Sequence, residues 1–204
     1  MPSPRDIPQV KHAWSKLPYD KLIIKYKPQH IAYLEAKQFF LDHAEYDRLV
    51  ICADDLVIKE KNLENLLSFS DKFKVLDGLC NIDESQPDTY ACQPLNCNLK
   101  GDKPETRKGA WFSKEHIPKL PTNNRFLEVG HSGAVCRIIQ RETFKKLSFE
   151  GGNENKTGWF DFGMSKELEI LKIPIMVDTV TIMEHLRTAQ KPINDYGYTI
   201  WQQR

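Results

Sequence analysis

The sequence predicts an α/β protein with a mainly parallel central sheet, and two observations support this. Short apolar runs predict strands at 22–24, 48–54 and 74–82, and the run 49–52 is of the kind that forms a strand buried on both faces. Segments with apolar residues at helical spacing separate these runs, and a strand–helix–strand series builds a parallel sheet that is covered by helices. We therefore expect a single domain in which the sheet lies between layers of helices.

The first part of the chain is expected to lead into this domain. Residues 1–20 contain four prolines, which indicate an extended segment on the surface. The domain itself would span 21–187, with residues 22–24 as its first strand. Pro28 can occupy the first turn of a helix that runs to about Ala44. Apolar residues at helical spacing give this helix one buried face; they are Ile31, Leu34, Ala36, Phe39 and Phe40.

The remaining elements follow from the same patterns. Residues 48–54 predict a strand, 59–73 a helix and 74–82 another strand. The polar segment 83–124 is irregular, as long functional segments are, with short strands possible near 90–95 and 111–112. Strands are then expected at 125–129, 134–139 and 174–185, helices at 141–147 and 160–171, and a polar, glycine-rich loop at 151–158. The tail, 188–204, is expected to pack on the domain.

Composition limits the classes of function. A chain of 204 residues is long enough for one domain with a substantial core. Its 29 basic and 28 acidic residues give a formal charge of +1, which provides no broad electrostatic surface for nucleic acid. No apolar run is as long as a membrane span, and the N-terminus has no apolar signal region. We therefore expect a cytoplasmic protein without a membrane span; the oligomeric state is left open.

The five cysteines predict reduced, mostly structural thiols. Their number is odd and no pair has the C-x-x-C spacing of a redox or zinc motif. A zinc site built from Cys92, Cys97 and a distant histidine is an alternative that lacks the second close pair of ligands.

An acidic pair marks the first candidate site. Asp54 and Asp55 follow a buried apolar run directly, and two carboxylates there are costly unless a cation or hydrogen-bond donors satisfy them. Open α/β sheets bind ligands at the carboxyl ends of their strands, where Mg²⁺ or Mn²⁺ takes a few carboxylates together with substrate phosphates. The alternative is a turn in which an aspartate caps the next helix.

Three later segments carry further candidates. His185 ends a strand-like run, and a neutral imidazole suits Mn²⁺, although a lone histidine is more often a packed or surface side chain. Asp161 lies among aromatic residues, either as a charge at a helix N-terminus or as a carboxylate whose pKa an apolar wall raises toward that of a general base. The glycines of G-H-S-G, 130–133, allow close approach to a ligand or simply form a tight turn.

The order of these motifs resembles the glycosyltransferases of the GT-A fold, in particular the family 2-like group. The matching segments are A-D-D at 53–55, V-L-D-G-L at 75–79, G-H-S-G-A-V-C-R at 130–137, W-F-D-F-G-M at 159–164 and V-D-T-V-T-I-M-E-H-L at 177–186. The resemblance covers roughly residues 21–187 and implies a Rossmann-like α/β/α sandwich. The sequence differs from the family pattern at Ala53 and Phe160, where acids are usual, and its nucleotide-binding half is short.

The resemblance also implies roles for single residues. Asp55 would touch the metal directly, and His185 would complete the metal site. Asp54 would contact the donor ribose or the water shell of the metal. Asp161 would be the catalytic base that takes the proton of the acceptor hydroxyl. The turn formed by Gly130, His131, Ser132 and Gly133 would approach the donor sugar.

The implied reaction transfers a sugar from a nucleotide-diphosphate sugar to a glycan or other hydroxyl acceptor. Mn²⁺ or Mg²⁺ would stabilise the charge of the leaving diphosphate, and a single base without a second nucleophile implies inversion at the anomeric carbon. Two other functions stay open. One is a non-catalytic module that binds nucleotide or glycan. The other is a nucleotidyltransferase, although the segment after the first strand, K-Y-K-P-Q-H, lacks the glycine-rich loop of that class.

Overall fold

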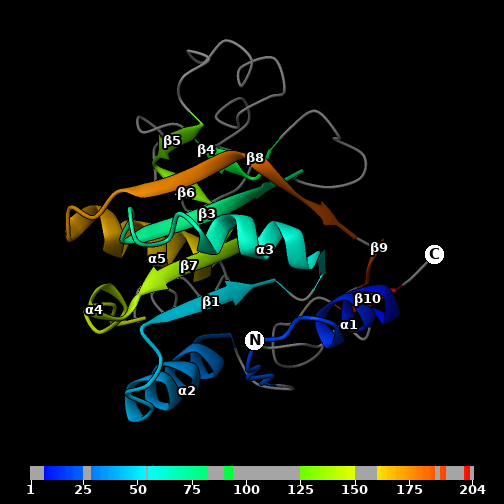
Figure 1. The fold of residues 1–204 in the computed structure, drawn as a ribbon, viewed down its shortest axis with the longest axis horizontal. Helices are drawn as coiled ribbons and strands as arrows, with labels where there is room; N and C mark the ends of the chain where they lie inside the picture. The colour runs from blue at the N-terminus through cyan, green and yellow to red at the C-terminus, as the bar shows by residue number, and fades with distance from the viewer. Residues whose placement is uncertain are drawn as a thin grey trace.

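Helices cover both faces of a central mixed sheet in the computed structural model of the chain (Figure 1). The structure describes residues 7–24, 29–53, 55–81, 90–93, 125–149, 160–186, 189–191 and 200–202. The sheet has six strands, in the order β1–β7–β3–β8–β2, with β5 also paired to β8. The strands are β1 (Arg48–Cys52), β2 (Leu56–Val57), β3 (Val75–Cys80), β5 (Phe126–Val129), β7 (Cys136–Gln140) and β8 (Ile175–His185).

The α/β class is confirmed, but the expectation of a mainly parallel sheet is wrong. Among the pairs of described strands, only β3 with β8 is parallel. The strands β1 and β3 do run in the same direction, as a strand–helix–strand unit requires. They are not neighbours, however, because β7 lies between them and is antiparallel to both. The short strands β2 and β5 then add antiparallel partners to β8.

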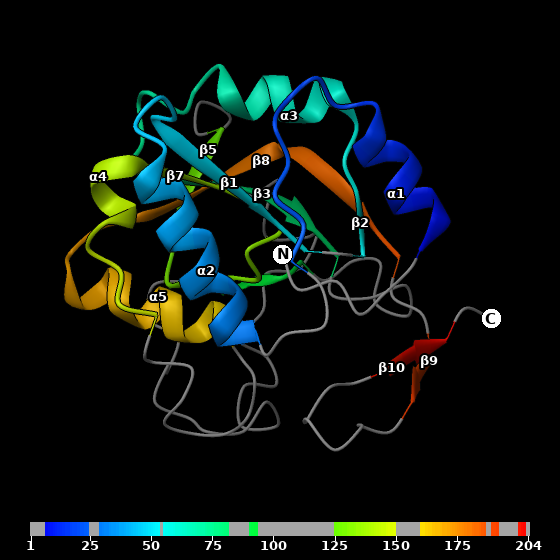
Figure 2. The same ribbon diagram turned by 90° about the horizontal axis from the view of Figure 1, so that it is seen from below.

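The helices form two layers, one on each face of the sheet (Figure 2). On one face lie α1 (Pro8–Ser15) and α3 (Glu60–Leu67), where Leu63 and Leu66 pack in a core with Leu56 and Ile138. On the other lie α2 (Gln29–Asp42), α4 (Arg141–Phe144) and α5 (Phe160–Ile170). Their core includes Phe40, Phe144, Met164 and Leu168. The central strands β3 and β7 are therefore buried on both faces, which explains their continuous apolar runs.

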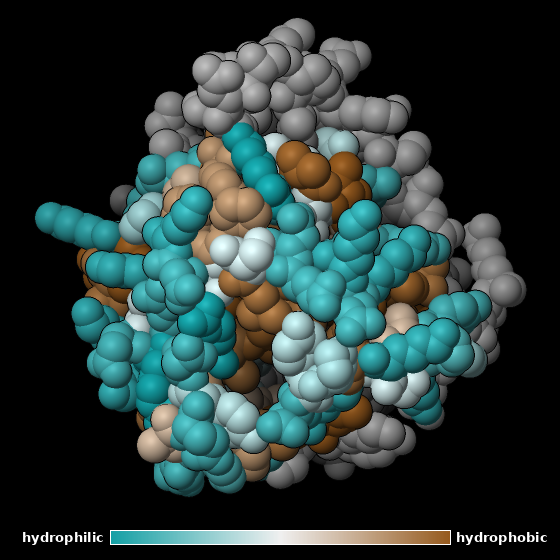
Figure 3. Space-filling model, in the orientation of Figure 1, coloured by the Kyte–Doolittle hydropathy of each residue, from teal (hydrophilic) through white to brown (hydrophobic). Residues whose placement is uncertain are grey.

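The outer side of the α1–α3 layer is mostly hydrophilic, with small apolar areas between the polar side chains (Figure 3). Within the described part of the chain, no helix is both long enough and apolar enough to cross a membrane.

The N-terminal segment differs from its expected extended form. Residues 8–15 form α1, which begins with Pro8 in its first turn and buries Val10. Trp14 joins this helix to the sheet, because its indole N–H donates to the Leu56 carbonyl at 3.2 Å. The strand expected at 22–24 is not formed: Leu22 and Ile23 are exposed, and only Ile24 makes an isolated bridge.

Most other elements lie where the sequence predicts them. The helix α3 is shorter than expected, since turns replace its last residues from Ser68 onward. Two small ladders complete the description: β4 (Cys92–Gln93) pairs with β6 (His131–Ser132), and β9 (Ala189–Lys191) pairs with β10 (Ile200–Gln202). The packing of the tail on the domain stays a prediction. The expected strand at 111–112 and the glycine-rich loop at 151–158 fall outside the described residues.

A bulge in β8 is held by the buried carboxylate of Asp178. Four residues, 178–181, lie opposite the single residue Gly78 of β3. Asp178 accepts hydrogen bonds from Arg125 Nε and Nη2 at 2.9 and 2.7 Å and from the Thr181 hydroxyl at 2.6 Å. Burial alone would raise the pKa of Asp178, but these bonds and that from the Val180 N–H lower it below its ordinary value.

The stabilising effect of Asp178 should fade in acid. Because its pKa is lower in the folded state, the ionised carboxylate stabilises the fold fully above the unfolded pKa of about 3.9, and this is lost as the pH falls through the folded pKa. We expect Asp178→Asn to lower the free energy of unfolding by about 2 kcal/mol at pH 7, since Arg125 is part-exposed and is rehydrated. Urea unfolding should show this difference shrinking toward pH 3.

The control is Asp42→Asn on the exposed end of α2, which should change neither the stability at pH 7 nor its pH dependence. A difference between wild type and Asp178→Asn that stays constant from pH 7 to pH 3 would contradict the assignment.

Candidate functional site

The candidate residues that the structure describes gather at one edge of the sheet. Because β1, β3 and β8 run in the same direction, their carboxyl ends meet at this edge, beside the start of β7. Asp55 follows β1, and His185 ends β8. The tight turn expected at 130–133, called the glycine turn, holds the short strand β6 in the structure. It is tied to the same edge, since the Gly133 N–H donates to the Ala91 carbonyl and the Ala91 N–H to that of Cys80 at the end of β3.

Asp55 and His185 are brought into direct contact, although they are far apart in the sequence. His185 Nε2 lies 2.9 Å from Asp55 Oδ2, and both side chains are largely buried. The pairing of β2 with β8 places them, because Leu56 is the register partner of His185 and the Leu186 N–H donates to the Asp55 carbonyl. The metal site that the resemblance implies requires these two residues to lie close together, and they do; metal binding itself stays a prediction.

The orientation of His185 restricts what can lie between the two groups. Its Nδ1 is 2.8 Å from the carbonyl oxygen of Asn81, which can only accept, so Nδ1 carries a proton. In the neutral ring Nε2 therefore presents its lone pair to a carboxylate oxygen. That arrangement is favourable only if a cation is shared between them, either a proton, which gives an imidazolium–carboxylate pair, or a metal ion.

The donor set described so far comprises two ligands. Asp54 lies outside the described residues, and no group of three or more His, Cys, Asp or Glu residues suited to a metal occurs among those that are described. Two ligands suit Mg²⁺ or Mn²⁺, which complete their shells with water and substrate phosphates.

Asp161 lies in the first turn of α5 with its side chain about one quarter exposed. Its Oδ1 accepts the Phe162 N–H at 2.9 Å, so the carboxylate is placed at the helix N-terminus, where negative charge is stabilised. Gly133 approaches it closely: a Cβ added to Gly133 would lie 3.9 Å from Asp161 Oδ2 and 3.3 Å from Ala91 Cβ. The glycine turn and the expected base therefore do converge.

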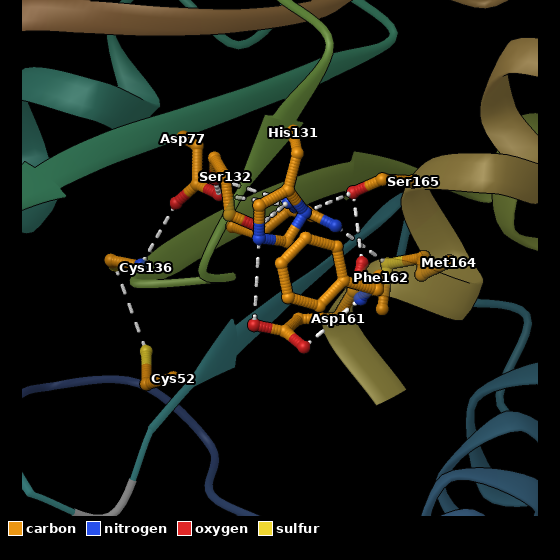
Figure 4. Close-up of polar contacts among 10 residues, drawn as sticks. Cys52, Asp77, His131, Ser132, Cys136, Asp161, Phe162, Met164 and Ser165 are labelled. Atoms are coloured by element: carbon orange, nitrogen blue, oxygen red, sulfur yellow. Dashed lines mark hydrogen bonds and ion pairs between the residues drawn. The ribbon is translucent and has the colours of Figure 1, made fainter. Parts of the chain in front are cut away.

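The side chains of His131 and Ser132 point into the protein and not outward from the turn (Figure 4). Both are fully buried. His131 Nδ1 is 2.9 Å from Ser165 Oγ, and its ring stacks on Phe162 at 3.6 Å between centroids. Any approach of this turn to a donor sugar must therefore use its backbone and the part-exposed glycines Gly130 and Gly133.

A buried ion pair behind the turn was missed by the sequence interpretation. Asp77 of β3 and Arg137 of β7 are both inaccessible to solvent, with Arg137 Nε 3.1 Å from Asp77 Oδ2. Asp77 also accepts from the Cys136 N–H at 3.0 Å and from the Ser132 hydroxyl. Arg137 donates to the Ser132 carbonyl at 2.9 Å and contacts Met164 Sδ at 3.0 Å. The available signal was a lone charge inside each of two apolar runs, V-L-D-G-L and C-R-I-I.

The described cysteines are all free thiols. Cys52 and Cys136 are register partners on β1 and β7, with their sulfur atoms 3.6 Å apart. The contact with Cys52 and burial raise the pKa of Cys136, and burial raises that of Cys92. Cys97, the other member of the alternative zinc pair, lies outside the described residues.

Comparison with known proteins bears on the fold alone. No protein-family model matches the chain, and no curated protein matches it. A solved structure described as "Crystal Structure of A197 from STIV" is similar, with a TM-score of 0.50 and 15% sequence identity. The match covers 96% of this chain and 87% of that one. The likeness therefore extends over nearly the whole α/β architecture.

Removing the charge of Asp77 should strongly destabilise the protein. Asp77→Asn leaves the Arg137 guanidinium buried without its counter-charge, and such losses cost about 3–5 kcal/mol. Replacing both residues, Asp77→Asn with Arg137→Met, should recover part of the loss, because no unpaired buried charge remains. Urea unfolding of the two single variants and the double variant measures this coupling. Additive losses in the double variant would contradict a direct interaction.

Proposed function

We propose that the chain is a metal-dependent glycosyltransferase of the GT-A type, which transfers a sugar from a nucleotide-diphosphate sugar to an acceptor hydroxyl. The observation that carries the proposal is the pairing of Asp55 with His185, 130 positions apart in the sequence, at the carboxyl edge of the sheet. The ordered motifs of the sequence add support, and so does the approach of Gly133 to Asp161 at the same edge.

The pair fits a divalent cation. Two ligands held at about 2.1 Å and at right angles on an octahedral ion lie ~3 Å apart, close to the 2.9 Å between Asp55 Oδ2 and His185 Nε2. The bond from His185 Nδ1–H to a backbone carbonyl is the arrangement that orients metal-binding histidines. Mn²⁺ or Mg²⁺ bound here would supply positive charge for the leaving diphosphate. Asp54 is the proposed support, at the ribose or the water shell.

Asp161 is the proposed general base. It is the part-exposed carboxylate beside the glycine turn, so an acceptor hydroxyl can reach it. Its Oδ1 accepts the Phe162 N–H, and Oδ2 is the oxygen that we propose takes the proton of the acceptor during attack. With Asp161 as the base and no second nucleophile assigned among the described residues, the reaction would invert the configuration at the anomeric carbon. Transfer then requires the donor to lie between Asp161 and the Asp55–His185 pair.

Metal binding can be measured without knowing either substrate. Calorimetric titration of the protein with MnCl₂ should show binding that His185→Ala and Asp55→Asn each weaken by at least about tenfold, the loss that even outer-shell partners of metal ligands cause. His43→Ala, at the end of α2 and outside this edge, should bind Mn²⁺ as wild type does. Equal affinity in all four proteins would remove Asp55 and His185 from the metal site.

Transfer itself can be tested with UDP- and GDP-sugars. Wild type should release nucleoside diphosphate in the presence of Mn²⁺ or Mg²⁺ and an acceptor. Asp161→Asn should keep metal and donor binding but lose transfer by about 10²- to 10⁴-fold, because the base is absent. The matched control is Glu169→Gln on the exposed side of α5, which should transfer normally.

The outcomes separate the rival functions. Binding of a sugar nucleotide without turnover over a broad panel of acceptors would favour the non-catalytic module. If no donor is bound or turned over with either metal, the transferase proposal is lost.

A further inference from the structure

His131 lies directly behind the proposed base. It is inaccessible to solvent, and its Nε2 is 3.8 Å from Asp161 Oδ2 (Figure 4). Two contacts fix the ring, the Ser165 hydroxyl at Nδ1 and the stacked ring of Phe162, and the pairing of β6 with β4 fixes the backbone that carries it. A ring held in this way has one available orientation, so Nε2 faces Asp161 persistently.

The hydrogen bonds also decide which nitrogen carries the proton. The Ser165 hydroxyl donates its only hydrogen to the Asp161 carbonyl at 2.8 Å, because a carbonyl oxygen can only accept. The bond at 2.9 Å between His131 Nδ1 and Ser165 Oγ must therefore use a hydrogen on Nδ1. In the neutral ring Nε2 is then the basic atom, and it is turned toward the carboxylate of Asp161.

The other titratable groups around β6 are either paired with an opposite charge or neutral. On β3 and β7, Asp77 is paired with Arg137, and on β8 Asp178 is paired with Arg125. On β4, burial raises the pKa of the Cys92 thiol, which keeps it neutral. On α5, the charge that faces the ring is Asp161 itself. Among the described residues, Asp161 is therefore the group whose charge His131 senses most directly.

We propose that His131 is a positioning residue that shares one proton with Asp161, so that the two act as a single base. This inference rests on the proposed function. The acceptor hydroxyl gives its proton to Asp161 Oδ2 as its oxygen bonds to the anomeric carbon, and the bond from that carbon to the nucleoside diphosphate breaks, so that the diphosphate leaves with the electron pair. The proton then passes to His131 Nε2, which restores the carboxylate and leaves an imidazolium paired with it. The passage requires the two atoms to close by about 1 Å, to hydrogen-bond distance.

The sharing has a consequence for pH dependence. The competent form has Asp161 ionised and His131 neutral, because a proton already bound to His131 leaves no site for the proton that Asp161 takes from the acceptor. The acid limb of the rate profile should therefore lie near the ordinary range of histidine, about 6.5, and not near that of a carboxylate, about 4. In His131→Gln the amide cannot bind the proton, so we expect a rate lowered by about tenfold and an acid limb moved toward that of a carboxylate.

The direct test is the titration of His131 by NMR with ¹⁵N-labelled histidine, which needs no sugar nucleotide. Wild type should show the Nδ1–H tautomer at high pH and a protonation step between pH 5 and 9. In Asp161→Asn the pKa of His131 should fall by about one unit or more, because the imidazolium loses its counter-charge. Asp42→Asn should leave it unchanged. The variant His131→Phe, which keeps a ring to stack on Phe162, identifies the signal.

Three results would overturn the proposal: an Nε2–H tautomer, no protonation of His131 in the folded protein over this range, or the same titration in wild type and Asp161→Asn. Ser165→Ala is the second variant should Asp161→Asn fold poorly. It should weaken the preference for the Nδ1–H tautomer, and an unchanged tautomer would count against the proposal. If His131 titrates as expected but the protein transfers no sugar, the transferase proposal alone is refuted. If the protein transfers sugar but the titration of His131 is the same in wild type and Asp161→Asn, the shared proton alone is refuted.

Discussion

The carboxylate of Asp77 is the interaction on which this edge of the sheet depends. The ladder between β3 and β7 has only two register pairs, Val75 with Ile139 and Leu76 with Ile138. At the next position Asp77 accepts the Cys136 N–H with its side chain, so a carboxylate replaces the backbone carbonyl as the two strands separate. Arg137 neutralises the charge of Asp77 and also donates a hydrogen bond to the Ser132 carbonyl. The strands β3 and β7 can therefore diverge without leaving these polar groups unsatisfied. The glycine turn is fixed at the opening, which is the place where the two strands separate.

Two histidines at the opening are held by the same device. In His131 and in His185 a hydrogen bond from Nδ1 fixes the ring, through a serine in one and a backbone carbonyl in the other. Each ring then turns its basic Nε2 toward a carboxylate, Asp161 or Asp55. Nε2 is 3.8 Å from the carboxylate oxygen in the His131–Asp161 pair and 2.9 Å in the His185–Asp55 pair. The two distances suit different chemistry. The shorter one fits two ligands of one cation, whereas the longer one leaves room for a proton to be taken up on Asp161 first.

Much of the fold could be predicted because apolar runs mark the strands, most clearly in β3 and β7, which are buried on both faces. Their continuous apolar runs located β1, β3, β5, β7 and β8, and helical spacing located α2, α3 and α5. Direction and adjacency could not be predicted in the same way. An apolar run such as that of β7 is compatible with either direction, and its insertion between β1 and β3 is a long-range choice that local periodicity does not encode. The helix α1 was missed because the four prolines of residues 1–20 were interpreted as the mark of an extended segment, although Pro8 occupies the first turn of the helix, where proline is tolerated.

The part of the candidate site that could be predicted consists of polar residues that follow or interrupt apolar segments. Asp55, His185 and Asp161 stand out because they follow or interrupt apolar segments, and a sheet brings strand ends together. Asp77 and Arg137 also interrupt apolar runs, but lie within strands, so only the pairing of β3 with β7 shows that each satisfies the other. His131 is harder still. A glycine turn suggests a surface position, and the burial of its ring depends on α5, which supplies both Ser165 and Phe162 from 30 or more residues away. Side-chain direction at such a turn is therefore set by tertiary packing, and the role of His131 follows from that packing and not from its place in the motif.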